Sequence, residues 1–366
     1  MADFNEKTES INLQLSCKDC GALLKFKPGT TNLTCEYCGA QNAIAKSDEK
    51  TVITENSLED ILSKNMQSEE QMEVTSVKCD GCHAINTFEP KTVSDKCAFC
   101  GSPLVVQGGS RSKMHKPQYV LPFGIETQAA TAIFKKWLSS RWFAPSKLVH
   151  YADTAEGLSG VYLPFWTFDC KTSTNYSGQR GEHYTELESY TTTENGQQVT
   201  RQRDVTKTNW HNASGRVSNT FDDILIQATK SLDKTKLQSL EPWDLKNLKE
   251  YNDHYLSGFR TESFGIDVRT GYGEARLRMV PTIENTIKGD IGGDDQRINS
   301  KNTTYSDPSF KHILLPVWVS AFRYNNKVYQ FIINARTGEL QGKRPYSTTK
   351  IVLAILAGAA LLLILF

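Results

Sequence analysis

The chain has 366 residues, which is long enough for two or more domains. Apolar residues make up 39% of it and charged residues 23%, proportions that are ordinary for a globular protein. The formal net charge of +1 excludes a global basic field that would attract nucleic acid, although it leaves room for a local basic patch.

Eight of the nine cysteines lie in two clusters near the start of the chain. Both clusters read C-x2-C, fourteen residues, C-x2-C, and each cysteine of the second lies 62 positions after its counterpart in the first. Equal internal spacing indicates an internal repeat. The members are Cys17, Cys20, Cys35 and Cys38 in the first cluster and Cys79, Cys82, Cys97 and Cys100 in the second.

The chemistry of the clusters favours one Zn²⁺ ion in each of them. Thiol ligands at this spacing are typical of tetrahedral four-sulfur sites. Disulfides are the alternative, and the paired C-x2-C pattern favours metal over them. Four cysteine ligands leave no open coordination position, so we expect structural rather than catalytic ions. Free thiolates need a reducing compartment, which places the cysteine region in the cytosol.

We expect these cysteines to lie in two small β zinc ribbons, residues 11–45 and 74–107. Each unit has about 35 residues, too few to form a stable hydrophobic core without a cross-link such as a metal ion. Zinc is therefore expected to supply much of the local folding free energy. His83 is interpreted as a surface residue, because the cysteine set beside it is already complete. The segments resemble zinc ribbons of the transcription-factor-IIB or rubredoxin-like kind, in which CxxCG knuckles lie on β-hairpins.

The segment between the ribbons, residues 46–73, is acidic and polar. Ser57 to Asp60 fits a capping box, and Leu58 and Ile61 would share the apolar face of a short helix. We favour a solvated linker that carries this one helix. The alternative is a helix that docks into the groove of a partner.

Residues 115–346 are predicted to form an α+β domain with mostly antiparallel strands. Three similar strings, YVLPF, VYLPFW and ILLPVW, begin at Tyr119, Val161 and Ile313. They indicate either related strands of one sheet or a packing pattern that recurs at three places in the domain. Asn-Gly at position 195 predicts a long β-hairpin. Its strands are expected at 167–190 and 199–210, those of a second hairpin at 319–324 and 328–333, and helices at 126–141, 222–229, 233–240, 243–251 and 271–287.

A search of this domain for chemistry finds no recognisable catalytic or cofactor-binding motif. Residues 338–344 (GELQGKR) have the wrong glycine spacing for a phosphate-binding loop and lack its Ser or Thr. The acidic stretch 289–295 is interpreted as a helix C-cap and loop rather than a calcium loop. The histidines are scattered, and Cys170 is interpreted as a buried, inert thiol. We therefore assign no catalytic residue, and an enzyme is the less favoured class.

The domain also carries a family resemblance. The strings YLPFWTFD, SGRVSNTFDDIL, LEPWDLK, DIGGDDQRI and FKHILLPVWVSAFRY resemble those of a bacterial family of zinc-ribbon proteins with a terminal membrane segment. Members often carry the label primosomal protein N′ or superfamily II helicase. This chain lacks the helicase phosphate loop, so the resemblance does not imply that it is a helicase or ATPase by itself.

The tail, residues 351–366, is apolar throughout and is predicted to be a single transmembrane helix. Lys343, Arg344 and Lys350 precede it, which places the bulk of the chain on the cytosolic side. The expected architecture is thus two tandem ribbons, an α+β domain and a tail anchor.

These features lead to three functional hypotheses. The favoured one is a membrane-anchored scaffold or adaptor whose ribbons bind a protein partner on the cytosolic face. The second is a nucleic-acid-binding protein of replication or transcription, for which the candidate phosphate contacts are Lys18, Lys25, Lys27, Lys78, Lys91 and Lys96. The third is an enzyme of unknown type with its site in the 115–346 domain.

Overall fold

The computed structural model describes most of the chain. The described residues are 15–44, 53–63, 71–82, 84–88, 94–105, 110–143, 145, 158–194, 196–324 and 327–365. His83, Lys91 and the turn residues Asn195, Asn325 and Asn326 lie outside them.

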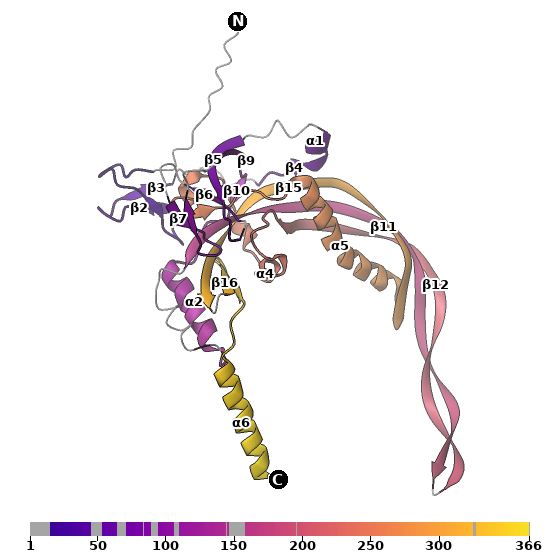
Figure 1. Cartoon of the computed structure of the whole chain (residues 1–366). Helices are drawn as coiled ribbons and strands as arrows, with labels where there is room; N and C mark the ends of the chain where they lie inside the picture. Colours follow the sequence, from indigo (N-terminus) through magenta and orange to yellow (C-terminus); the bar gives the residue numbers. More distant parts are fainter. Residues whose placement is uncertain are drawn as a thin grey trace.

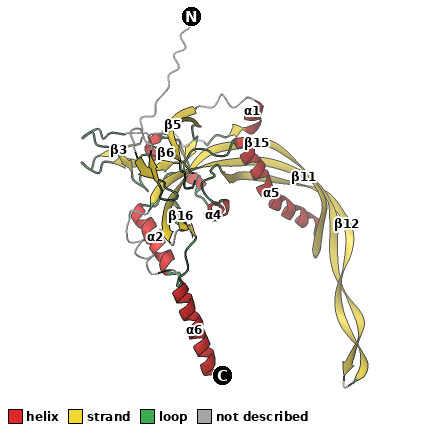
Figure 2. Cartoon of the chain, in the orientation of Figure 1, coloured by secondary structure: helices red, strands yellow, loops and turns green. Residues whose placement is uncertain are grey.

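One large sheet organises the fold (Figures 1 and 2). Its three longest strands are β11 (Ser159–Glu194), β12 (Gln197–Gln227) and β15 (Asp295–Tyr324), and β11 lies between the other two. Most neighbours are antiparallel, but β15 pairs in parallel with β10 and β11 pairs in parallel with β14, so the sheet is mixed. The shorter strands are β4 (Asn56–Ser57), β10 (Tyr119–Val120), β13 (Lys249–Glu250), β14 (Arg260–Thr261), β16 (Lys327–Asn334) and β17 (Leu340–Gly342).

The prediction of an α+β fold is wrong, because the described chain is mostly β. Residues 222–229, expected to be helical, instead continue β12 to Gln227 and pair with β11. Residues 243–251 give only a 3₁₀ turn at Leu245–Asn247 followed by β13. In both places a neighbouring strand supplies the backbone partners, and this outweighs a weak local preference for helix.

The three strings that share the Leu-Pro pattern lie side by side in the sheet. Tyr119 pairs in parallel with Ile313, and Leu163 pairs antiparallel with Leu315. The interpretation as related strands of one sheet is therefore confirmed. The predicted hairpins are also confirmed: β11 pairs with β12 across Gly196, and Val319 of β15 pairs with Ile332 of β16.

Helix α5 (Val268–Ile291) packs on the long strands. The Asp267 side chain caps its start by accepting from the Thr270 amide, and Gly292, with a φ of 67°, ends it. The interpretation of residues 289–295 as a C-cap and loop is thereby confirmed. The other α-helices described are α1 (Leu58–Ser63), α2 (Thr127–Ser139), α4 (Lys234–Gln238) and α6 (Thr348–Leu365), and a second 3₁₀ turn is Asp253–Tyr255.

The cysteine-rich segments form small sheets, as predicted. The first contains β1 (Lys25–Phe26), β2 (Asn32–Thr34) and β3 (Gln41–Ala43). The second contains two sheets, one of β5 (Gln71–Lys78), β6 (Ile85–Phe88) and β9 (Ser110–His115), the other of β7 (Ser94–Lys96) and β8 (Pro103–Val105).

The segment between the ribbons is more than a solvated linker in its described part. β4 pairs with β15 through Ser57 and Ser309, and the side chain of Leu58 is fully buried in the apolar cluster that also holds the buried residues of α5. The Tyr119 hydroxyl also accepts a hydrogen bond from the Thr54 amide at 2.6 Å. Burial of Leu58 and these contacts tie the chain between the two ribbons to the large sheet.

A two-stranded hairpin extends beyond the rest of the sheet. β15 begins opposite Gly181, and past that point β11 and β12 pair only with each other, from Glu182 opposite Asn209 to Glu194 opposite Gln197. We call residues 182–194 and 196–209 the arm. At about 3.4 Å per residue it is roughly 44 Å long, and Figure 1 shows it leading away from the body.

The predicted membrane helix at 351–366 corresponds to α6. Its first turn holds Thr348, Thr349 and Lys350, so its apolar part is about 22 Å long, shorter than a bilayer core of about 30 Å. Among the described helices, none is long and apolar enough to cross a membrane. The prediction of a transmembrane, tail-anchored, single-pass membrane protein with its bulk in the cytoplasm is therefore wrong.

Candidate metal centres

Each predicted cysteine cluster comes together in space. The four sulfur atoms of a cluster lie within 4.8 Å of one another. The Sγ–Sγ distances are 3.6 Å for Cys17–Cys38 and 3.5 Å for Cys20–Cys35. In the second cluster Cys79–Cys100 and Cys82–Cys97 repeat these values at 3.5 and 3.6 Å. A tetrahedral ion with metal–sulfur bonds of about 2.3 Å needs sulfurs about 3.8 Å apart, so both clusters can hold a metal ion.

Each C-x2-C turn, here called a knuckle, directs backbone N–H groups at the sulfur atoms. The amides of Asp19 and Cys20 donate to Cys17 and lower its pKa to about 6. In the second cluster, contact with Cys82 and the amides of Phe99 and Cys100 lower the pKa of Cys97 to about 5, against the effect of burial. Contacts with the other thiols and burial raise the pKa values of Cys20, Cys38, Cys79 and Cys82. Without an ion each cluster therefore keeps some of its thiols protonated, and because metal binds the thiolate form, binding would release these protons.

Glycine permits this geometry directly after a knuckle. Gly39 and Gly101 have φ values of 74° and 71°, where a side chain would be strained. Their amides donate to the carbonyls of Cys35 and Cys97, which closes each knuckle turn. The CxxCG pattern therefore has a direct backbone cause.

Two asparagines extend the polar shell of the clusters in a related way. Asn42 lies four positions after Cys38 and donates to Cys17 Sγ across the first cluster at 3.8 Å. Asn86 lies four positions after Cys82 and donates to Cys97 Sγ across the second cluster at 3.6 Å. Each asparagine follows one knuckle and contacts the first cysteine of the other. Such hydrogen bonds orient ligands and stabilise their negative charge.

The first ribbon packs on the body of the molecule through β1. The Phe26 amide donates to the Ser257 carbonyl at 3.0 Å, and the Ser257 hydroxyl donates to the Leu24 carbonyl at 2.6 Å. The Phe26 ring meets Tyr255 edge to face with centroids 5.3 Å apart. Cys17 and Cys35 belong to the same buried apolar cluster as these residues and the sheet beneath them.

The second ribbon packs on the body through one of its knuckles. Phe99, between Cys97 and Cys100, is only 1% exposed and lies in the apolar cluster formed by the large sheet. Its carbonyl accepts from Gln330 Nε2 of β16 at 2.6 Å. Both cysteine clusters are therefore part of the packed body of the molecule.

Within the described part of the chain, the histidines, Cys170 and the candidate phosphate-contacting lysines do not converge on one site. His183 pairs with Asp295 at 2.8 Å on the surface, and His312 is buried beside Trp166. Cys170 is buried, as predicted, and burial raises its pKa. Lys25 pairs with Glu36 and Lys27 with Glu126, and these ion pairs do not favour a phosphate-contacting role for the two lysines.

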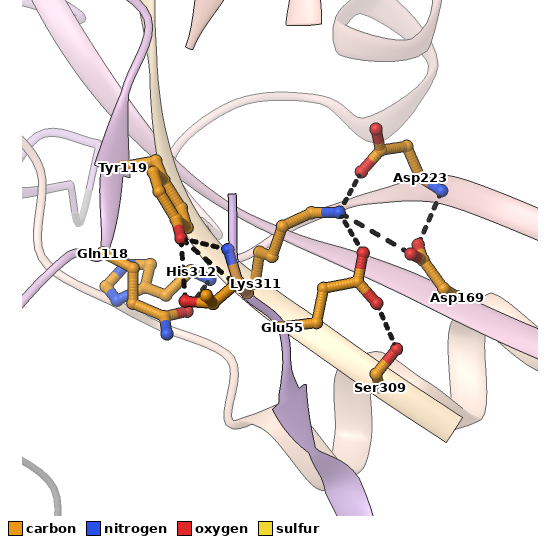
Figure 3. A network of polar contacts seen from close by, with 9 residues as sticks. Glu55, Gln118, Tyr119, Asp169, Asp223, Ser309, Lys311 and His312 are labelled. Atoms are coloured by element: carbon orange, nitrogen blue, oxygen red, sulfur yellow. Dashed lines mark hydrogen bonds and ion pairs between the residues drawn. The ribbon is translucent and has the colours of Figure 1, made fainter. Parts of the chain in front are cut away.

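The structure also assembles a charged cluster that the sequence analysis missed (Figure 3). Lys311 of β15 is 4% exposed, and its Nζ lies 2.8 Å from Glu55 Oε1, 2.8 Å from Asp223 Oδ1 and 3.6 Å from Asp169 Oδ2. Asp223 has a φ of 53°, and its amide donates to Asp169 at 2.7 Å. Because the Lys311 ammonium already lies among the oxygen atoms of these carboxylates, we do not interpret the cluster as a metal site.

The charged groups of this cluster shift one another's pKa values. Burial, followed by the hydrogen bond with Glu55, raises the pKa of Asp169 to about 7. The same hydrogen bond, together with Lys311, lowers the pKa of Glu55 to about 2. Burial alone would lower the pKa of Lys311, but its hydrogen bonds to Asp223 and Glu55 raise it. No spacing pattern could have revealed this set, since Glu55 and Lys311 are 256 positions apart.

Comparison with known proteins adds one similarity along nearly the whole chain. The "Uncharacterized protein YdjG" of Bacillus subtilis (strain 168) is 25% identical over 345 residues, which cover 93% of this chain and 92% of that protein. No protein-family model and no solved structure matches the chain. The resemblance to a bacterial zinc-ribbon family therefore stays a prediction, and the part of it that has support is the pair of four-cysteine clusters, whose geometry fits tandem zinc ribbons.

Proposed function

We propose that the protein is a zinc-dependent scaffold whose first ribbon binds a protein partner through the knuckle that carries Tyr37. Zinc is the ion that fits best, since all eight donors are thiols and their spacing is tetrahedral. Four sulfurs close each coordination sphere, so the ions hold the ribbons in shape and leave binding to the protein surface.

The internal repeat carries the proposal. Tyr37 and Phe99 occupy the same place in equivalent knuckles, CEYCG and CAFCG. Phe99 is 1% exposed because its knuckle is docked on the sheet, whereas Tyr37 is 81% exposed. An aromatic ring on a metal-fixed turn loses little conformational entropy on binding, and such rings dominate protein interfaces.

The docking of Phe99 also indicates what the partner surface should look like. Phe99 enters an apolar cluster on a β-sheet, and a side-chain amide, that of Gln330, donates to its carbonyl. We expect Tyr37 to enter a comparable apolar pocket at a partner's β-sheet, with a donor beside it for the knuckle carbonyl.

The metal part of the proposal is tested by elemental analysis of the purified full chain. We expect two zinc ions per chain, and the loss of one in each of Cys35→Ser and Cys97→Ser. Cys170→Ser is the matched control, because Cys170 lies outside both clusters, and it should retain both ions. An absence of zinc, or equal loss in the control, would contradict a structural role for zinc.

The partner part is tested by photo-cross-linking from position 37. A photoreactive phenylalanine analogue at position 37 is compared with one at Leu277, which is 74% exposed on α5. The protein captured at 37 alone is then purified and titrated against wild type, Tyr37→Ser and Leu277→Ser. We expect Tyr37→Ser to weaken binding by about tenfold or more while zinc content is unchanged. Equal capture at both positions, or equal affinity of all three proteins, would refute partner binding through this knuckle.

A further inference from the structure

A cationic cavity lies between the end of α2 and the segment that follows β16. Its volume is about 960 Å³, which is large enough for a drug-sized ligand. One wall is the last turn of α2 and the residues after it, and the other is the stretch 338–344 that fails as a phosphate-binding loop. Four of the residues that line it are cationic: Lys136, Arg141, Lys343 and Arg344.

The positive charge of this cavity is not compensated within the described part of the chain. Glu339 is the one carboxylate that lines it, and none of the four cations forms an ion pair there. Lys136 and Arg141 follow the usual preference for cations at a helix C-terminus, but that preference does not account for Lys343 and Arg344. Lys136, Arg141 and Lys343 are exposed, so solvent screens their mutual repulsion, and all four charges would attract an anion in the cavity.

Arg344 gives the most specific indication of that anion. Its Nη1 atom is buried and has no hydrogen-bond acceptor among the described residues. A buried donor on a charged group without an acceptor is costly, and a guanidinium matches phosphate oxygens in geometry. The guanidinium also lies 4.9 Å from the ring centroid of Tyr346, which lines the same cavity and is 61% exposed.

We propose that this cavity binds an organic phosphate. Arg344, Lys343, Lys136 and Arg141 hold the phosphate oxygens, and the exposed ring of Tyr346 contacts the flat organic part of the ligand. A phosphate group has several strong hydrogen-bond acceptors, which suits a site with four cations. An aromatic group on the same ligand would pack against the solvent-exposed ring of Tyr346. This site is independent of the metal centres and of the Tyr37 knuckle.

The test uses isothermal titration of the full-length, zinc-loaded protein with ADP, pyrophosphate and adenosine as probes. ADP and pyrophosphate are expected to bind and adenosine is not, because the cations supply most of the attraction. Arg344→Gln and Lys343→Gln should each weaken ADP binding by about tenfold or more. Tyr346→Ser should weaken ADP binding and leave pyrophosphate binding unchanged.

Lys249→Gln is the matched control, because Lys249 is an exposed lysine that does not line the cavity. It should bind ADP like wild type, and all variants should keep the wild-type melting temperature. The proposal is overturned if ADP gives no binding heat at millimolar concentration, if Arg344→Gln binds it as tightly as wild type, or if Lys249→Gln loses as much as Arg344→Gln. Equal affinity for adenosine and ADP would overturn it as well.

Discussion

At the scale of single residues, Lys311 shows how a buried charge is accommodated in this sheet. Its ammonium lies among Glu55, which directly precedes β4, Asp169 of β11 and Asp223 of β12. The arrangement attaches the chain between the ribbons to the sheet by an ion pair as well as by backbone bonds. Removal of the Lys311 charge should destabilise the fold by more than its ion pairs stabilise it, because the carboxylates left behind stay partly buried without a cation.

We expect Lys311→Met to lower the free energy of unfolding by about 3–5 kcal/mol at neutral pH, because two or three carboxylates lose their compensating charge. Urea unfolding followed by circular dichroism measures this. Lys301→Met is the control: Lys301 pairs with Glu284 at a more exposed site, so the loss should be below about 1 kcal/mol. Equal losses would show that Lys311 is not a special position.

Asp169 should make stability depend on pH. Its pKa is raised to about 7 from an ordinary value of 3.8, so the folded state holds a proton that the unfolded state releases. Stability from this group is present below about pH 4 and is lost as pH rises towards 7.

Asp169→Asn mimics the protonated form of this carboxyl and removes its titration. We expect the variant to be more stable than wild type at pH 8, on the order of 1–2 kcal/mol after screening, and equal to it near pH 4. Urea unfolding across this range measures the difference. If the free energies of unfolding of the variant and the wild type differed by the same amount at every pH, the raised pKa of Asp169 would be contradicted.

At the scale of elements, the arm is the part of the sheet that the core does not hold. Tyr184, Leu187, Tyr190 and Val199 are all exposed along it. Its strands are joined by cross-strand ion pairs, Lys207 with Glu186 and Arg203 with Glu188. Exposed pairs of this kind contribute little to stability, so the arm depends on its attachment to the three-stranded base.

Shortening the arm should leave the body intact. We expect deletion of residues 184–207, with Asn-Gly inserted to join His183 to its register partner Thr208, to change the melting temperature by less than about 3 °C. Thermal unfolding followed by circular dichroism tests this. His183 is kept because its amide donates to Asp294 at the base of the arm. A large loss of stability would contradict this expectation and would mean that the arm contributes to the stability of the body.

At the scale of the whole molecule, the cysteine clusters and the large sheet share continuous apolar cores. Cys17 and Cys35 share one apolar cluster with the sheet, and Cys79 and Cys97 share another. Each ribbon would be a separate module if its apolar residues packed only against other residues of the same ribbon. Here the core of each ribbon is completed by residues of the body.

Removal of the metal should therefore destabilise the whole chain and not only its first part. We expect a chelator to lower the melting temperature by about 10 °C or more, in a single transition seen alike by near-ultraviolet and far-ultraviolet circular dichroism. Addition of zinc should restore the original value. Two separate transitions, with that of the sheet unmoved by the chelator, would show that the ribbons fold independently of the body.

The sequence by itself determined the two cysteine clusters, their glycine turns and the long hairpin around Asn195-Gly196, because each depends on residues close together in the chain. The predictions for residues 222–229 and for the tail were wrong. Local periodicity could not show that residues 222–227 pair with β11, and apolar content could not show that the tail helix is too short to cross a membrane.

Only the tertiary structure decided which knuckle is covered and which charges meet. Phe99 and Tyr37 occupy equivalent positions in the sequence repeat. Phe99 is buried and Tyr37 is exposed because the large sheet covers only the knuckle of Phe99. Lys311 and Glu55 meet because β4 pairs with β15, and contacts between such distant segments depend on the whole chain.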